Sequence, residues 1–209
     1  MNDISNTQTF YLMEITNRSL MAAAKSSLKG NWKNAVIVTL VGLLLLGVSS
    51  IIPVLGALLL GGPIMLALIS VYIKLARGQK GDLNDFVETL KAGLSGRFLQ
   101  LFLLFVIYTI LVAVGYFLLI VPGIILSLGL SQIFIIANDE PELDATEVLK
   151  KSWEMMKGYK MRLFLLYLRF IGWMLLAMLT FGIGYFWLAP YIYVTVVKFH
   201  DEVLKKDVR

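Results

Sequence analysis

The stretch Phe98–Asn138 reads FLQLFLLFVIYTILVAVGYFLLIVPGIILSLGLSQIFIIAN and contains no charged residue over 41 positions. A helix needs about 20 apolar residues to cross a hydrocarbon core about 30 Å thick, so this run is long enough for two crossings. One continuous helix of this length would extend roughly 60 Å, about twice the thickness of the core. The cluster Val121-Pro122-Gly123 therefore predicts a turn between two membrane-spanning helices.

Two further uncharged runs flank this one, Asn34–Ile73 with 40 residues and Phe170–Val197 with 28. The third run extends back to Leu163 if Arg169 is accepted within a helix. Clusters at 49–53 and 181–184 contain Pro or Gly and predict a turn in each run. The expected spans are 34–52, 54–73, 98–121, 123–138, 163–181 and 183–199, which makes an all-α, polytopic membrane protein with six transmembrane helices as three hairpins.

Composition supports membrane insertion of the chain 1–209 as a single membrane domain. Of its residues, 58% are hydrophobic and only 16% are charged, and the mean hydropathy is +0.79. A water-soluble core could not cover that much apolar surface. Without Cys, and with His200 as the one histidine, the sequence offers neither disulfides nor a His-rich metal site. We expect no cofactor and no metal.

Basic residues predict the orientation in the membrane. Eighteen of the 19 Lys and Arg residues precede Asn34, follow Val197, or lie in the segments 74–97 and 150–162. The three predicted turns on the opposite side carry none, and basic loops are retained in the cytoplasm. Both termini are therefore expected to be cytoplasmic. The net charge of +5 then needs no nucleic-acid partner, because Lys and Arg beside the membrane also meet anionic lipid headgroups.

A repeated unit is a further interpretation, with copies at 18–80, 84–142 and 144–204. Each copy holds an amphipathic, interfacial helix, a glycine and a hairpin. The alternative is convergence, since every polytopic protein leaves the membrane through similar flanking segments. The amphipathic stripes are Leu20, Ala24, Leu28 and Trp32; Phe86, Leu90, Leu94 and Phe98; and Ala145, Leu149 and Trp153, and the matching glycines are Gly30, Gly96 and Gly158.

Arg169 is a charge that lies about six residues inside the expected span 163–181, which makes it the centre of a candidate intramembrane polar site with Gln100 and Gln132. The alternative is that its long side chain reaches the headgroups from about 10 Å depth. Candidate interfacial contacts are Trp32, Lys33, Trp153 and Lys157. No acid, base or nucleophile arrangement occurs in the uncharged runs, so we predict no catalytic residues.

Two other groups leave alternatives open. The acidic residues of 139–144 could hold a divalent cation, or they could form a solvated loop in which Asp144 caps the next helix and Glu147 completes a capping box. A second group could line a ligand cavity or form an interfacial aromatic belt: Tyr185, Trp187, Tyr191 and Tyr193.

Residues 135–202 resemble a family of bacterial membrane proteins known as domain of unknown function 975, and the likeness is looser upstream. The resemblance rests on 135–139, 151–158 (KSWEMMKG), 170–173 (FIGW), 182–184 and 190–192. It implies an integral protein of the bacterial plasma membrane without an established activity. The family typically has a small polar residue at the position of Arg169, so a family-wide role for that charge is not expected.

From these observations we expect a non-enzymatic membrane component that binds lipid or another protein, in envelope maintenance or in resistance to membrane-active agents. Its expected partners are membrane lipids or another membrane protein, and not nucleic acid. The alternative is a small transporter or channel subunit, which the repeat and the polar side chains at membrane depth favour.

Overall fold

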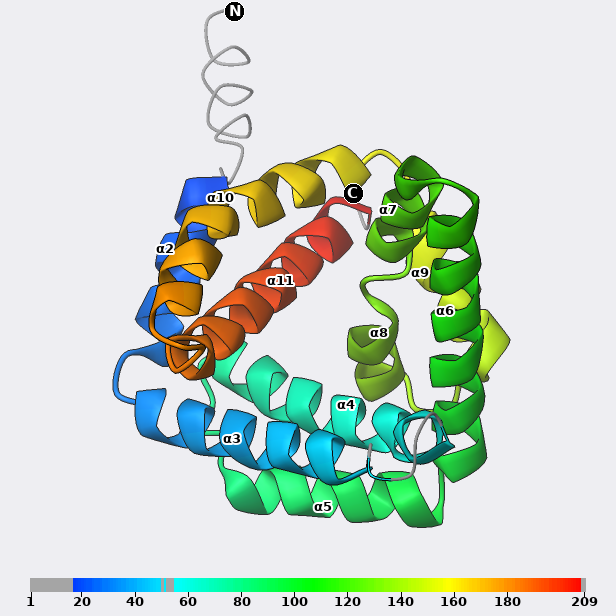
Figure 1. The fold of residues 1–209 in the computed structure, drawn as a ribbon, viewed down its shortest axis with the longest axis horizontal. Helices are drawn as coiled ribbons and strands as arrows, with labels where there is room; N and C mark the ends of the chain where they lie inside the picture. The colour runs from blue at the N-terminus through cyan, green and yellow to red at the C-terminus, as the bar shows by residue number, and fades with distance from the viewer. Residues whose placement is uncertain (1–16, 50, 52–54, 208–209) are drawn as a thin grey trace, which may run out of the picture.

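The computed structural model describes residues 17–49, 51 and 55–207. These residues form helices joined by turns and loops, so the predicted all-α class is confirmed for them. The helices, labelled as in Figure 1, are α2 (Asn17–Leu28), α3 (Trp32–Ser49), α4 (Leu55–Ala76), α5 (Leu83–Ser95), α6 (Phe98–Leu118), α7 (Ile120–Gly129), α8 (Ile133–Asp139), α9 (Ala145–Met155), α10 (Lys160–Leu179) and α11 (Tyr185–Asp207).

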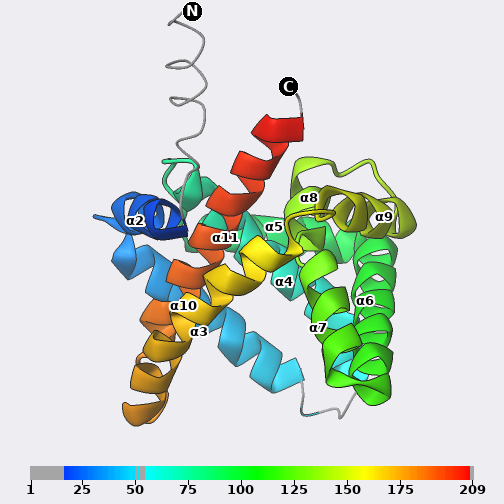
Figure 2. The same cartoon turned by 90° about the horizontal axis from the view of Figure 1, so that it is seen from above.

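Long helices that follow one another pack in pairs, α3 on α4, α6 on α7 and α10 on α11. Figure 2 shows the α6–α7 and α10–α11 turns on one side of the molecule and the shorter helices α2, α5 and α9 on the other. Helix α4 contacts α3, α5, α6, α8 and α11 and forms the centre of the core. Helix α11 crosses the middle of the molecule diagonally in Figure 1.

Five helical segments in the described part of the chain are long and apolar enough to cross a membrane. They keep large apolar side chains on the surface, such as Phe117 near the end of α6 and Leu179 at the end of α10. Surfaces of this kind are expected on helices that face lipid. Helix α11 is not one of the five, and its C-terminal part carries charged side chains. The five segments are Trp32–Ser49, Leu55–Ala76, Phe98–Leu118, Ile120–Asp139 and Lys160–Leu179.

Two of the three predicted turns can be compared with the structure. The turn at 181–184 is confirmed and follows α10 directly. The turn predicted at Val121-Pro122-Gly123 lies earlier, at Leu119, whose extended backbone separates α6 from α7. Pro122 falls in the first turn of α7, where a missing N–H costs little because those amides lack helical partners in any case. Part of the turn predicted at 49–53 lies outside the described residues.

The helix predicted at 123–138 is interrupted at 130–132 and forms α7 and α8 instead. The hydroxyl of Ser152 on α9 donates to the carbonyl of Gly129 at 2.9 Å and accepts from the amide of Gln132 at 3.3 Å. In an unbroken helix these two backbone groups would bond within the helix. A side chain from another helix therefore satisfies the groups that the interruption frees.

The three short amphipathic helices are confirmed as structural elements, and α2 and α9 bury their predicted stripes. Leu20, Ala24 and Leu28 are buried on α2, whereas Leu94 on α5 is 42% exposed. The predicted capping box of Asp144 and Glu147 opens α9, and Asp82 and Asp85 form a second one at α5.

The glycines that follow these helices differ among the three positions. Gly30 and Gly158 have φ of 85° and 82°, a conformation that favours glycine. Gly96 has φ of −99°. Therefore only Gly30 and Gly158 need to be glycine for the sake of the backbone conformation, and Gly96 does not.

Candidate functional site

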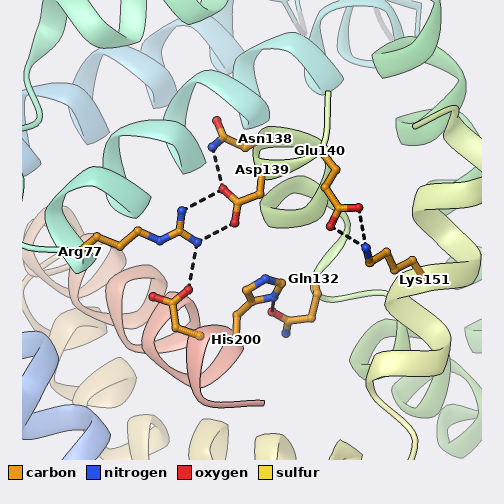
Figure 3. A network of polar contacts seen from close by, with 8 residues as sticks. Arg77, Gln132, Asn138, Asp139, Glu140, Lys151 and His200 are labelled. Atoms are coloured by element: carbon orange, nitrogen blue, oxygen red, sulfur yellow. Dashed lines mark hydrogen bonds and ion pairs between the residues drawn. The ribbon is translucent and has the colours of Figure 1, made fainter. Parts of the chain in front are cut away.

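Three helices, α4, α8 and α11, meet at one ionic cluster, which consists of Arg77, Asp139 and Asp201 (Figure 3). Arg77 follows α4, Asp139 ends α8, and Asp201 lies on α11. The guanidinium of Arg77 donates to both carboxylate oxygens of Asp139, at 3.0 and 2.6 Å, and to Asp201 Oδ1 at 3.0 Å. Asn138 donates to Asp139 Oδ1 at 3.3 Å. One cation therefore joins two carboxylates from elements far apart in the sequence.

The charge of Arg77 is fixed by these partners. The hydrogen bonds that Arg77 donates to Asp139 raise the pKa of Arg77 above its ordinary value, against the effect of burial, and Asp201 raises it further. Two-point contacts between guanidinium and carboxylate are also among the stronger and more directional ion pairs. The cluster consequently works as a fixed link between α4, α8 and α11.

A buried polar pair, Gln132 and His200, lies beside the cluster. His200 Nδ1 is 3.3 Å from Gln132 Oε1, and the Gln132 amide donates to Ser131 Oγ at 2.7 Å. An amide oxygen can only accept, so His200 Nδ1 carries the proton. Burial lowers the pKa of His200 to about 4, although Asp201 and Asp139 act to raise it. The imidazole is therefore neutral at pH 7.

Three further ion pairs surround this region. Lys151 binds Glu140, Lys74 binds Asp85, and Arg162 contacts both oxygens of Glu202 at 2.9 and 2.8 Å. The acidic run 139–144 is thus used in ion pairs and in the cap of α9. Among the described residues, no group of three or more His, Asp or Glu side chains is placed to hold a metal ion.

A central cavity of about 500 Å³ lies beside this region, and residues of α8 and α11 that precede the cluster in the chain line it. Its wall combines aliphatic side chains with three phenylalanines and three tyrosines, and Ser127 and Ser131 add hydroxyl groups. The interrupted segment between α7 and α8 also faces it. The lining side chains are Leu46, Met65, Ile69, Phe105, Tyr108, Ile124, Ser127, Leu128, Leu130, Ser131, Ile133, Phe134, Ile135, Phe164, Tyr167, Tyr193 and Val196.

A second hollow of about 390 Å³, the lateral groove, lies between α2, the start of α3, α10 and α11. Three of the four tryptophans of the chain line it, together with a single charged side chain, Lys25. The full set is Lys25, Trp32, Trp173, Leu176, Ala177, Thr180, Gly184, Trp187, Leu188 and Tyr191. Trp173 and Trp187 are 55% and 50% exposed, so the groove opens at the surface of the helices.

The residues of the predicted intramembrane polar site have separate partners. Gln132 is fully buried beside His200. Gln100 accepts from Arg97 Nε at 2.9 Å and donates to the carbonyl of Leu143. Arg169 is exposed on α10, and no ion pair within the described part of the chain involves it.

The predicted interfacial residues lie at the start of α3 and near the end of α9. Trp32 is half-buried in the lateral groove, and Lys33 beside it is exposed. Trp153 packs on Gly129, with the ammonium of Lys160 rather than Lys157 3.2 Å from its ring centre. Lys157 is exposed.

Sequence reasoning missed Arg77, Asp201 and the tyrosines of α6 and α10. One signal was available for the ionic cluster, because Arg77, Asp139 and Asp201 follow one another at intervals of 62 residues. The tyrosines carried no such signal. Of the aromatic group at 185–193, Trp187 and Tyr191 line the groove and Tyr193 lines the cavity.

The fold and the site define an all-helical protein with several helices compatible with a multi-pass membrane protein. Residues 106–207 match the family model described as "Protein of unknown function (DUF975)", so the family resemblance read from the sequence is confirmed over this part. No curated protein and no solved structure matches the chain.

Proposed function

We propose that the protein crosses the bacterial plasma membrane six times, with both termini in the cytoplasm. The uncharged part of α11, up to Val197, supplies the sixth crossing beside the five apolar segments. The arrangement in Figure 2 supports this orientation, since the α6–α7 and α10–α11 turns lie on one side and α2, α5 and α9 on the other, and the chain segments around these short helices hold most of the Lys and Arg residues. Reporter fusions after Tyr116 and Gly182 then report outside, and those after Gly81 and Glu142 report inside; the reverse pattern rejects the topology.

In this orientation the protein serves as a non-enzymatic membrane component that binds an anionic phospholipid in the lateral groove. The observation that carries the proposal is the combination of an apolar, tryptophan-rich wall with one cation, Lys25. Acyl chains pack on such a wall, and tryptophan favours the boundary between hydrocarbon and headgroups. No described residue forms an ion pair with Lys25, which leaves its ammonium available for a lipid phosphate.

Retention of lipid by the purified protein tests this function. The protein is exchanged into nanodiscs that contain equal amounts of phosphatidylglycerol and phosphatidylcholine, extracted with mild detergent, and analysed by native mass spectrometry. The wild type is expected to retain phosphatidylglycerol in excess. Lys25→Gln removes this preference, because the phosphate loses its cation, and Trp173→Ala with Trp187→Ala lowers retention of both lipids.

Lys29→Gln is the matched control, since Lys29 lies on the same face of the membrane and outside the groove. It removes the same charge, so an equal effect of Lys25→Gln and Lys29→Gln would show that net charge and not the groove selects the lipid. Retention of both lipids at the level of a mock extract rejects the proposal.

A small transporter or channel subunit is the second candidate, and the central cavity favours it. Irregular backbone at membrane depth is tolerated where it lines a cavity, and interrupted helices often frame transport sites. The interruption at 130–132 meets that description. Proteoliposomes loaded with pH-sensitive and K⁺-sensitive dyes test ion transport directly, and fluxes equal to those of empty liposomes reject the transport of these ions.

A further inference from the structure

Three tyrosines from three different helices line the central cavity: Tyr108 on α6, Tyr167 on α10 and Tyr193 on α11. Their phenol groups are close enough to interact electrostatically with one another. The ring of Tyr193 is held by Tyr72, on which it stacks with 5.2 Å between ring centres and 7° between planes. The three side chains therefore converge on one space from different sides.

The hydroxyl groups of these tyrosines have no hydrogen-bond partner within residues 17–49, 51 and 55–207. Among the described residues, the one fully buried side-chain polar atom without a partner is Asn17 Oδ1, so the three phenol oxygens remain accessible. Polar groups away from water are costly unless they are hydrogen-bonded. Three donors that face one cavity are thus arranged to meet an acceptor that enters it.

The other residues that line the central cavity restrict which kind of molecule can carry the acceptor. Phe105 and Phe134 form a tilted ring pair with 6.4 Å between centres, and Phe164 adds a third phenylalanine. Ser127 and Ser131 donate to carbonyls of α7 and are not free to act as donors to a ligand. No lining residue is charged. An ion would therefore lose its hydration without gaining a counter-charge, whereas a neutral aromatic molecule would pack well.

We propose that the central cavity is a binding site for a neutral molecule with a flat aromatic body and carbonyl-type oxygen acceptors, which the phenols of Tyr108, Tyr167 and Tyr193 recognise. Rings of the wall pack on the body of the ligand, and the hydroxyl groups donate to its oxygens. A cavity of about 500 Å³ falls within the range of about 300–1,000 Å³ that is usual for small-molecule sites. The site shares no lining residue with the lateral groove and does not depend on the lipid proposal.

Two probe molecules test hydrogen bonding to the phenols separately from packing on the aromatic rings. 1,4-Naphthoquinone has two carbonyl acceptors, and naphthalene has a similar flat body with none. Both are titrated by equilibrium dialysis into protein held in nanodiscs, with empty nanodiscs as the reference for partitioning into lipid. The wild type is expected to bind naphthoquinone at least tenfold more tightly than naphthalene.

The triple variant Tyr108→Phe, Tyr167→Phe, Tyr193→Phe removes the hydroxyl groups and keeps the rings. It is expected to lower the affinity for naphthoquinone about tenfold or more and to leave naphthalene binding unchanged, because each neutral hydrogen bond contributes modestly and three are lost. The double variant Tyr116→Phe, Tyr185→Phe is the control, since both of its tyrosines are about half exposed and lie outside the cavity. This control should bind both probes as the wild type does.

Equal affinity of the wild type for both probes, or an affinity for naphthoquinone that the triple variant does not change, overturns the proposal. The melting temperature of each variant is measured alongside. If the triple variant is unstable, the single change Tyr167→Phe replaces it, with an expected loss of threefold or more for naphthoquinone alone. A loss that affects naphthalene equally also overturns the assignment of the phenols as donors.

Discussion

The guanidinium of Arg77 contacts both carboxylate oxygens of Asp139, which stands 62 residues later in the chain. The same guanidinium reaches Asp201 after a further 62 residues. Arg77 follows α4, Asp139 ends α8 and Asp201 lies on α11, so the ionic cluster links these three helices at one point (Figure 3). The repeated unit itself stays a prediction.

Arg77→Gln is expected to lower the free energy of unfolding by about 1 kcal/mol, because it leaves two carboxylates without a cation, while the partial exposure of Arg77 allows water to screen them. Thermal unfolding in detergent, followed by circular dichroism, measures the change. Lys151→Gln is the control, since it breaks only the pair with Glu140. If Lys151→Gln lowers the free energy of unfolding as much as Arg77→Gln does, the ionic cluster has no special role in stability.

Stability is expected to fall as the pH decreases from about 6.5 to about 4, because burial lowers the pKa of His200 to about 4 and the unfolded chain binds the proton more readily. The linkage relation gives a loss of about 2 kcal/mol at pH 5. Unfolding curves at pH 7 and pH 5 measure this loss. His200→Asn should remove most of the difference between the two pH values; an equal difference in the variant assigns the pH dependence to other groups.

Ser152→Ala is expected to destabilise the protein by about 1–3 kcal/mol, since the carbonyl of Gly129 and the amide of Gln132 both lose their partner away from water. Ser127→Ala provides the comparison, because the Ser127 hydroxyl bonds only to Ile124 of its own helix. Chemical denaturation of both variants measures the difference. Similar midpoints for the two variants would falsify the role of Ser152 at the interruption.

Gly62→Ala is expected to cost about 1–3 kcal/mol, because the added methyl group would collide with the backbone carbonyl of Leu101 and push α4 away from α6. Gly47→Ala adds the same group where nothing lies within 4 Å and should be neutral or stabilising, since alanine favours a helix. The melting temperatures of the Gly62→Ala and Gly47→Ala variants test this prediction. Equal effects of the two substitutions contradict close packing at Gly62.

The helices could be predicted from the sequence because a long apolar run and its absence of charge are local properties. Pro122 misled the placement of the second turn, since proline is accepted within the first turn of a helix as readily as in a loop. The interruption at 130–132 depends on Ser152, whose hydroxyl comes from another helix. No local sequence pattern predicts a contact of this kind between two helices.

The candidate site was less predictable for the same reason. Gln132 was identified as a polar residue at membrane depth, but its partner His200 lies 68 residues away. The three tyrosines of the cavity come from α6, α10 and α11 and resemble ordinary lipid-facing aromatics until the helices are packed. Only the 62-residue spacing of the cluster was visible in the sequence.

The ionic cluster also imposes an order on biosynthesis. Arg77 is synthesised early, and its partners leave the ribosome 62 and 124 residues later. Until α11 arrives, the guanidinium has at most one of its two carboxylates, and the early helices lack the contact that closes the assembly. A chain interrupted in translation before Asp201 would therefore hold an arginine that lacks at least one of its two carboxylate partners.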